Sequence, residues 1–333
     1  MSNLLTNSRL RAWRDCKRRH RLLYLDGWRP RREDEAVSFG RLVHLGLEGW
    51  WKAAPEQRLY EAMLRISGRA HDLFQEAAVR ELLRAYDERY ASAMEGYEVL
   101  AVEATFTAPL LNPKTGAASR TFLLAGKVDG IVRERATGRV LLVEAKTTSE
   151  PIEDATTSYW RRLAMDGQVS HYYIGSESLG FSVEGCLYDV LLRPRLKPLK
   201  ATPEALRKYT KDGRLYAAQR EVDETPEEYA ARLRADIAEA PAKYFQRREV
   251  PRTEDDLRDY LFDAWAEARA MREAELAGRA ARSPEACFRF GACPFWVNCA
   301  EKVRLDDLPD EFERVQDVHP ELDLDPIEVS DAS

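Results

Sequence analysis

Three charged side chains interrupt two apolar runs in the stretch LAGKVDGIVRERATGRVLLVEAKTTSE, residues 124–150. Asp129 stands in the first run, and Glu144 and Lys146 stand in the second. Residues two apart on a strand point to the same face, so Glu144 and Lys146 are expected to share one. Two buried carboxylates repel each other unless a cation lies between them, and oxygen ligands favour Mg²⁺ or Mn²⁺. The pattern therefore predicts a divalent metal site with an ammonium group beside it.

The same pattern also has a simpler structural interpretation. A glutamate and a lysine two residues apart commonly form an ion pair on the solvated face of a strand. The turn-forming segment RATGR, residues 135–139, makes the two apolar runs partners in a hairpin under either interpretation. We expect Asp129 and Glu144 to approach each other at one edge of a sheet.

The elements that must position these residues follow from hydrophobic periodicity. Apolar residues recur at helical spacing through the N-terminal third, and β-branched apolar runs separated by turn residues follow. The expected helices cover residues 7–27, 36–51, 58–94, 154–178 and 202 to about 280, and the expected strands cover residues 98–110, 120–134, 139–147 and 183–194. With no internal repeat and no Gly/Ser linker, one α/β domain with helical insertions fits best.

Charge is distributed unevenly along the chain. Residues 1–32 carry ten Lys or Arg and two acids, whereas residues 305–333 carry eleven acids and one arginine. The chain as a whole has a net charge of −6, so residues 1–304 carry +4. The acidic segment has few core-forming residues, which predicts disorder. We therefore expect a single domain over residues 1–304 and a disordered tail over 305–333.

Length and composition exclude several classes of protein. The 333 residues are 44% hydrophobic, which is enough to bury a full core. No apolar run reaches the roughly 18 residues that a membrane helix needs, and no secretion signal opens the chain, so the cytoplasm is the expected location. Five cysteines, three of them close together near the C-terminus, indicate ligands rather than a secreted disulfide framework.

Four short motifs together resemble the PD-(D/E)XK nuclease superfamily, and in particular its RecB-like branch. That branch includes CRISPR adaptation exonucleases and RecB-type nucleases of phages and bacteria. The motifs are GRLVH, GKVDG, VEAKT and QVSHY, and they occur in the order of that branch at Gly40–His44, Asp129, Glu144 with Lys146, and Gln168 with Tyr172. The resemblance implies a restriction-endonuclease-like core, in which helices flank a mixed central sheet.

The resemblance also implies a role for each motif residue. His44, Asp129, Glu144 and the main-chain carbonyl of Ala145 would bind Mg²⁺ or Mn²⁺, which activates water. Lys146 would orient or help to deprotonate that water and would offset phosphate charge. Gln168 and Tyr172 would lie against the nucleic-acid backbone, with Tyr172 also available for stacking or for supporting the site. Further candidates for phosphate contacts are Arg14, Arg18, Arg21, Arg193 and Arg195.

The cysteines extend the same resemblance. The segment CFRFGACPFWVNC presents three of them, and a fourth lies near the N-terminus. In the family branch, one N-terminal and three C-terminal cysteines hold a [4Fe-4S] cluster that joins the two ends of the chain. By analogy the ligands would be Cys16, Cys287, Cys293 and Cys299, with structural Zn²⁺ as the alternative. The spacing departs from the tighter pair common in relatives. Cys186, within an apolar strand, is expected to be a small buried residue.

Two functions of different class follow. The first is a metal-dependent DNA nuclease, an exonuclease acting in recombination, repair, phage replication or CRISPR adaptation. The second is a catalytically silent iron–sulfur module that binds DNA beside a helicase or recombination protein. The intact set of Asp129, Glu144 and Lys146 favours the enzyme, since a binding module has no need of it. No Walker-type phosphate loop is present, so a helicase motor would be another chain.

Overall fold

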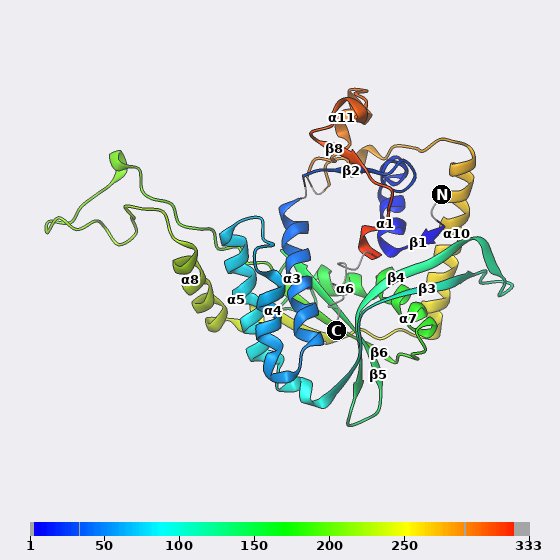
Figure 1. Cartoon of the computed structure of the whole chain (residues 1–333), viewed down its shortest axis with the longest axis horizontal. Helices are drawn as coiled ribbons and strands as arrows, with labels where there is room; N and C mark the ends of the chain where they lie inside the picture. Colours follow the sequence, from blue (N-terminus) through cyan, green and yellow to red (C-terminus); the bar gives the residue numbers. More distant parts are fainter. Residues whose placement is uncertain (1–2, 33, 290, 323–333) are drawn as a thin grey trace, which may run out of the picture.

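A mixed six-stranded sheet forms the centre of the chain (Figure 1). The computed structural model describes residues 3–32, 34–289 and 291–322. The sheet contains β1 (Leu4–Leu5), β3 (Tyr97–Leu111), β4 (Ala118–Glu134), β5 (Val140–Thr148), β6 (Gly185–Leu192) and β7 (Phe245–Glu249). The predicted α/β core with a mixed central sheet is therefore confirmed.

The order of the strands follows from the hairpin that the sequence predicted. β4 pairs antiparallel with β3 along most of its length and antiparallel with β5 through its last part. β5 then pairs parallel with β6, and β6 pairs antiparallel with β7. All eight residues of β6 are buried, as expected for a strand covered on both faces.

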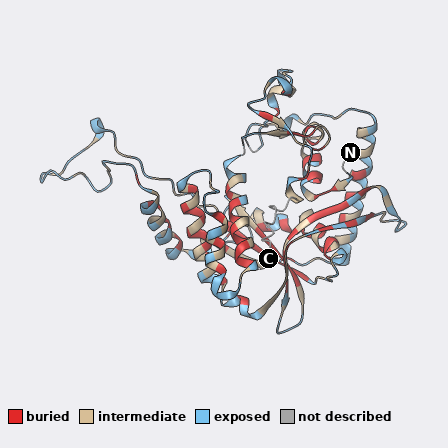
Figure 2. Cartoon of the chain, in the orientation of Figure 1, coloured by how far each residue is buried: buried red, intermediate tan, exposed pale blue. Residues whose placement is uncertain are grey.

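Helices cover the sheet, and buried residues gather where the two meet (Figure 2). α3 packs against β3 and β5, and α7 packs against β3 and β4. The described helices are α1 (Asn7–Asp15), α2 (Lys17–His20), α3 (Glu35–Lys52), α4 (Arg58–Ile66), α5 (Leu73–Tyr90), α6 (Ser158–Leu163), α7 (Gly167–Ser178), α8 (Pro226–Glu239), α9 (Pro241–Tyr244), α10 (Glu254–Leu276) and α11 (Trp296–Ala300).

One helical expectation is wrong. Residues 202–225 were expected to begin a helical segment, but only a single 3-10 turn forms there, at Glu204–Leu206. The strand β7, within the same expected segment, was also missed. Arg247 on β7 forms a bidentate ion pair with buried Asp189 on β6, at 2.5 and 2.7 Å. A pairing between side chains 58 residues apart leaves no local trace in the sequence.

The two ends of the chain pack on each other. β2 (Trp28–Pro30) pairs antiparallel with β8 (Phe312–Arg314), which forms a second, two-stranded sheet. A small separate core lies beside it, built from residues of both ends: Leu22, Trp28, Phe295, Leu305 and Phe312. The ends are thus joined by strand pairing and apolar burial.

Residues 305–322, which belong to the segment expected to be disordered, pack against the N-terminal end of the chain. Phe312 and His319 are buried, and Arg29 of the N-terminal segment donates to the carbonyl of Val318 at 2.8 Å. Few apolar residues are needed to hold this segment in place, because they pack into a core that the N-terminal end of the chain also builds. Residues 323–333 lie outside the described residues. Among the helices that the structure describes, none is both long and apolar enough to span a membrane.

Candidate active site

The predicted carboxylates lie where β4 and β5 separate. The ladder between these strands runs from Arg133 opposite Val140 to Gly130 opposite Val143, and Asp129 and Glu144 are the next residues. Beyond this point Asp129 Oδ2 accepts a hydrogen bond from the backbone N–H of Ala145 at 2.8 Å. The side chain of Asp129 thus takes the place of a backbone acceptor and is fixed next to Glu144.

Glu144 is the most buried member of the site, with 1% of its side chain exposed. Its Oε1 forms an ion pair with Lys146 Nζ and accepts a hydrogen bond from Gln168 Nε2 at 2.9 Å. Its Oε2 is buried and has no hydrogen-bond partner among the described residues. Burial, and then the nearby charge of Asp129, raise the pKa of Glu144 to about 8. One oxygen of this carboxylate is therefore left for a further ligand.

Lys146 lies on the same strand, and β6 holds its backbone in register. The parallel ladder pairs Glu144 with Tyr188 and Lys146 with Val190. Although burial opposes the charged form, the carboxylates of Glu144 and Asp129 raise the pKa of Lys146 above its usual value. The ammonium group therefore stays charged, and with 30% of its side chain exposed it remains open to solvent.

His44 reaches the site from α3. Its Nδ1 lies 3.5 Å from Asp129 Oδ2, and burial lowers the pKa of the imidazole. One turn earlier on the helix is Gly40, where a Cβ would lie only 3.0 Å from Thr147 Oγ1 on β5. The glycine thus lets the helix approach the strand that carries Glu144, which explains the spacing of the GRLVH motif.

Gln168 and Tyr172 reach the site from α7. Asp166 caps the helix and accepts from the backbone N–H of Gln168 at 2.7 Å. The side-chain Nε2 of Gln168 donates both to Glu144 and to the hydroxyl of Tyr172, each at 2.9 Å. The side chains of Gln168, Tyr172, Glu144 and Lys146 are therefore linked to one another, and the pair of His44 and Asp129 joins them through the backbone N–H of Ala145.

A further carboxylate at the site was missed from the sequence. Glu103 on β3 has 8% of its side chain exposed and forms an ion pair with Lys127 on β4. It is one of two non-glycine described residues with a positive φ, at 52°, a costly conformation within a strand. Burial, and then the charge of Asp129, raise the pKa of Glu103 to about 7. The signal in the sequence was a glutamate between the apolar residues Val102 and Ala104 of an expected strand.

Comparison with known proteins agrees with this geometry. A family model of the PD-(D/E)XK nuclease superfamily matches residues 5–300. The chain belongs to this superfamily. No curated protein matches it. The matched region contains the whole network around Glu144 and all five cysteines.

Nucleases of this superfamily bind divalent cations, and the donor set here can be tested for that role. In the described part of the chain, no three His, Cys, Asp or Glu side chains converge so that they could hold a metal ion. Of these donors, His44 lies beside Asp129, and Glu144 is paired with Lys146. Two carboxylates and an imidazole are nevertheless suitable donors, and the unpartnered Oε2 of Glu144 fits a hard cation. Ala145, whose carbonyl was the fourth predicted ligand, pairs with Asp189 in the β5–β6 ladder.

The arginines suggested for phosphate contacts do not form one surface. Arg14 pairs with Glu267 of α10 at 2.6 Å, and Arg21 lies 3.5 Å from Asp26. Arg18 has no ion pair among the described residues. At the other end of the set, Arg193 pairs with Glu35, and Arg195 donates to the carbonyl of Ser149. The last two lie near the end of β5, since the backbone N–H of Arg193 donates to the carbonyl of Thr148.

The four cysteines suggested as ligands border one cavity, but among the described residues no three of them converge closely enough to hold a metal ion. Cys16, Cys287, Cys293 and Cys299 all line one cavity of about 490 Å³. Leu22 and Phe295 of the small terminal core also line it, so the cavity lies where the two ends of the chain meet. All four are free thiols. The remaining cysteine, Cys186, is 1% exposed within β6 and lies apart from this cavity, which confirms it as a small core residue.

Proposed function

We propose that the chain is a Mg²⁺- or Mn²⁺-dependent deoxyribonuclease of the RecB-like branch, acting as an exonuclease. Processes that use such an activity are recombination, repair, phage replication and CRISPR adaptation. The observation that carries the proposal is the buried, unpartnered Oε2 of Glu144 next to Asp129. A carboxylate oxygen without a partner is costly to bury, and a bound cation would compensate it.

The residues of the site have different roles in hydrolysis. Asp129, Glu144 and His44 would hold the cation, together with the carbonyl of Ala145. When bound, the cation lowers the pKa of a water molecule and stabilises charge on the scissile phosphate. Lys146 orients the attacking water and offsets the negative charge of the phosphate. The water oxygen bonds to phosphorus, one ester bond from phosphorus to oxygen breaks, and the leaving oxygen takes a proton.

The test is cleavage of end-labelled DNA, single- and double-stranded, linear and circular, with Mg²⁺, Mn²⁺ or EDTA. We expect metal-dependent release of label from linear molecules and protection of closed circles. Cleavage of circles would make the protein an endonuclease. DNA binding without cleavage under every metal condition would refute the nuclease and support the silent binding module beside a helicase or recombination protein.

The proposal includes a [4Fe-4S] cluster held by Cys16, Cys287, Cys293 and Cys299, with Zn²⁺ as the alternative. The shared cavity of the four thiols supports it, since thiolate sets of four serve both kinds of centre. Such a centre would reinforce the junction between the two ends, adding to the pairing of β2 with β8.

Anaerobically purified protein is expected to be brown and to contain iron and sulfide. Any Cys→Ser change among the four should lower metal content and thermal stability, whereas Cys186→Ser should leave metal content unchanged. Colourless protein that contains zinc and no iron would replace the cluster with the alternative. Folded protein that contains neither would remove the centre altogether.

A further inference from the structure

A long arm separates β6 from α8. It comprises residues 197–224 and extends away from the body of the chain beyond α8 (Figure 1). The arm carries seven Lys or Arg and five Asp or Glu, and most of its residues are exposed (Figure 2). A segment of this length without a core of its own usually serves a function.

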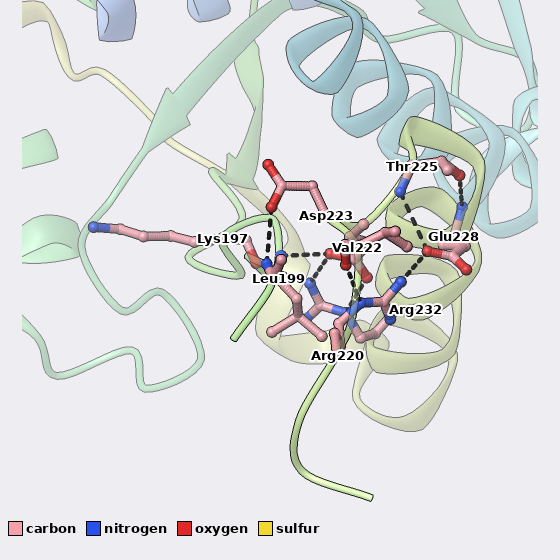
Figure 3. Close-up of polar contacts among 10 residues, drawn as sticks. Lys197, Leu199, Arg220, Val222, Asp223, Thr225, Glu228 and Arg232 are labelled. Atoms are coloured by element: carbon pink, nitrogen blue, oxygen red, sulfur yellow. Dashed lines mark hydrogen bonds and ion pairs between the residues drawn. The ribbon is translucent and has the colours of Figure 1, made fainter. Parts of the chain in front are cut away.

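The root of the arm is clamped to α8 by a buried carboxylate. Glu224 accepts from Arg232 Nε and Nη2, both at 2.8 Å, and from the backbone N–H of Leu199 at 2.7 Å. Arg232 also donates to the carbonyl of Lys197 at 2.8 Å. Figure 3 shows these contacts, and it shows the side chain of Lys197 extending away from them. The two sides of the root are thus held together and against one helix.

A second set of contacts continues the clamp. Asp223 accepts from the backbone N–H of Ala201 at 2.8 Å and from Lys200 Nζ at 2.9 Å. Arg220 forms an ion pair with Glu228, which is also part of the capping box of α8. Asp223 and Glu224 are therefore both held by contacts at the root of the arm. These contacts fix the direction in which the arm leaves the body of the chain.

The tip of the arm is a small hairpin. Tyr209 pairs antiparallel with Leu215, and the backbone N–H groups of Thr210 and Tyr216 donate to the carbonyls of Arg214 and Lys208 at 2.8 and 3.1 Å. Directly opposite residues of an antiparallel pair share a face, and the next pair along the ladder takes the other face. Tyr209 and Leu215 therefore occupy one face of the hairpin.

The other face combines one aromatic ring with two cations. It presents Tyr216, Lys208 and Arg214, because Lys208 stands opposite Tyr216, and Thr210 stands opposite Arg214. Tyr216 is 51% exposed. Neither Lys208 nor Arg214 has an ion pair with any described carboxylate. An exposed ring between two free cations is the arrangement that stacks a base and binds the phosphates beside it.

We propose that this face of the arm binds a single strand of the nucleic-acid substrate. The inference rests on the proposed nuclease function and adds a binding surface outside the active site. A base stacks on Tyr216, and the flanking phosphates lie against Lys208 and Arg214. We choose a nucleic acid as the partner because its negative phosphates complement the charge of the hairpin. Residues 206–216 hold four basic residues and one acid, in a chain with a net charge of −6.

The root of the arm lies near the end of the strand that carries Glu144 and Lys146. Thr148 ends β5, and its carbonyl accepts from the backbone N–H of Arg193 at 2.7 Å. The chain then runs through Arg195, whose side chain donates to the carbonyl of Ser149, and enters the arm at Lys197. A nucleic-acid strand that passes Asp129 and Glu144 can therefore continue along the arm. The arm would hold the part of the nucleic acid that is not being cleaved.

The test compares two tyrosines of one hairpin. Tyr209 is 50% exposed on the opposite face, so Tyr209→Ala is a matched control for Tyr216→Ala. Affinity for a labelled single strand of about 30 nucleotides is measured by fluorescence anisotropy in EDTA. We expect Tyr216→Ala to weaken binding roughly 5- to 100-fold and Tyr209→Ala to leave it nearly unchanged. Lys208→Ala with Arg214→Ala should reduce the slope of log K against log salt by about 1.4, since each contact with a single strand contributes about 0.7.

Cleavage separates failure of this inference from failure of the proposed function. If the wild-type protein cleaves DNA while both tyrosine variants bind the long strand equally well, the arm does not bind nucleic acid and the nuclease stands. If the wild-type protein neither cleaves nor binds, the proposed function fails and the inference fails with it. Preserved cleavage of a short strand by Tyr216→Ala, with weakened binding of the long one, supports the arm as a separate surface.

Discussion

Gln168 Nε2 donates to Glu144 Oε1 across 2.9 Å, although 24 residues separate the two in the chain. The same amide nitrogen donates to the hydroxyl of Tyr172. One oxygen of Glu144 is thus committed to the amide and to Lys146, and the other is left without a partner. The helix α7 therefore determines how this carboxylate is presented.

Removing the amide should reduce activity. We expect Gln168→Ala to lower kcat/KM by about 10- to 100-fold, the usual cost of losing a group that orients a metal ligand. Tyr172→Phe should have a smaller effect, because Gln168 can still donate to Glu144. The measurement is steady-state cleavage at several Mg²⁺ concentrations. A larger loss for Tyr172→Phe than for Gln168→Ala would show that the hydroxyl has its own role.

Changes at the centre of the site should separate chemistry from binding. Lys146→Ala and Asp129→Ala are each expected to abolish metal-dependent cleavage while leaving DNA affinity largely intact, since affinity rests on many phosphate contacts. Exposed Lys114 lies in the turn between β3 and β4, so Lys114→Ala serves as a charge-matched control. Cleavage at a near wild-type rate by either site variant would refute the assignment.

The close approach of α7 to the sheet depends on Gly175. A Cβ there would lie 2.2 Å from the ring of Phe106 on β3, so Gly175→Ala must displace either the ring or the helix. We expect a loss of about 1–3 kcal/mol in the free energy of unfolding, and reduced cleavage because the same helix carries Gln168. Gly96 has no neighbouring atom within 4 Å of a Cβ, so Gly96→Ala should stay within about 1 kcal/mol of wild type. Equal stability of the two variants, measured by denaturant unfolding, would contradict this.

His171 should make stability depend on pH. Burial lowers the pKa of this histidine to about 4, and its ring contacts the hydroxyl of Tyr260 and the carbonyl of Ala125. The unfolded chain takes up the proton near pH 6.5, before the folded chain does, so the stability that neutral His171 provides is full above pH 6.5 and declines as pH falls toward 4.

The expected difference is measurable by urea unfolding. Between pH 7 and pH 5, His171 should account for about 2 kcal/mol of the fall in the free energy of unfolding, so His171→Asn should show a shallower dependence on pH. His71 is 71% exposed, so His71→Gln should follow the wild-type curve. Parallel curves for His171→Asn and the wild-type protein would show that His171 does not titrate as described.

Local pattern was sufficient for the part of the fold that carries the catalytic candidates. The alternation of apolar residues and the turn at 135–139 predicted β3, β4 and β5 and the pairing of the last two, because side-chain period and turn chemistry are local properties. The residue types of Asp129, Glu144 and Lys146 likewise indicated metal chemistry before any contact was known. The four motifs could be recognised in order along the chain.

Tertiary structure decided what depends on partners distant in sequence. Glu103 belongs to the site because it pairs with Lys127 on the neighbouring strand and has a positive φ, and no spacing rule predicts either feature. Residues 305–322 pack on the body of the chain because strand β8 pairs with β2, which lies near the N-terminus. The segment before α8 is an arm and not a helix, because Glu224 and Arg232 clamp its two sides. In each case the stabilising contact joins segments far apart in sequence, so its free energy is absent from any local window and appears only when the chain has folded.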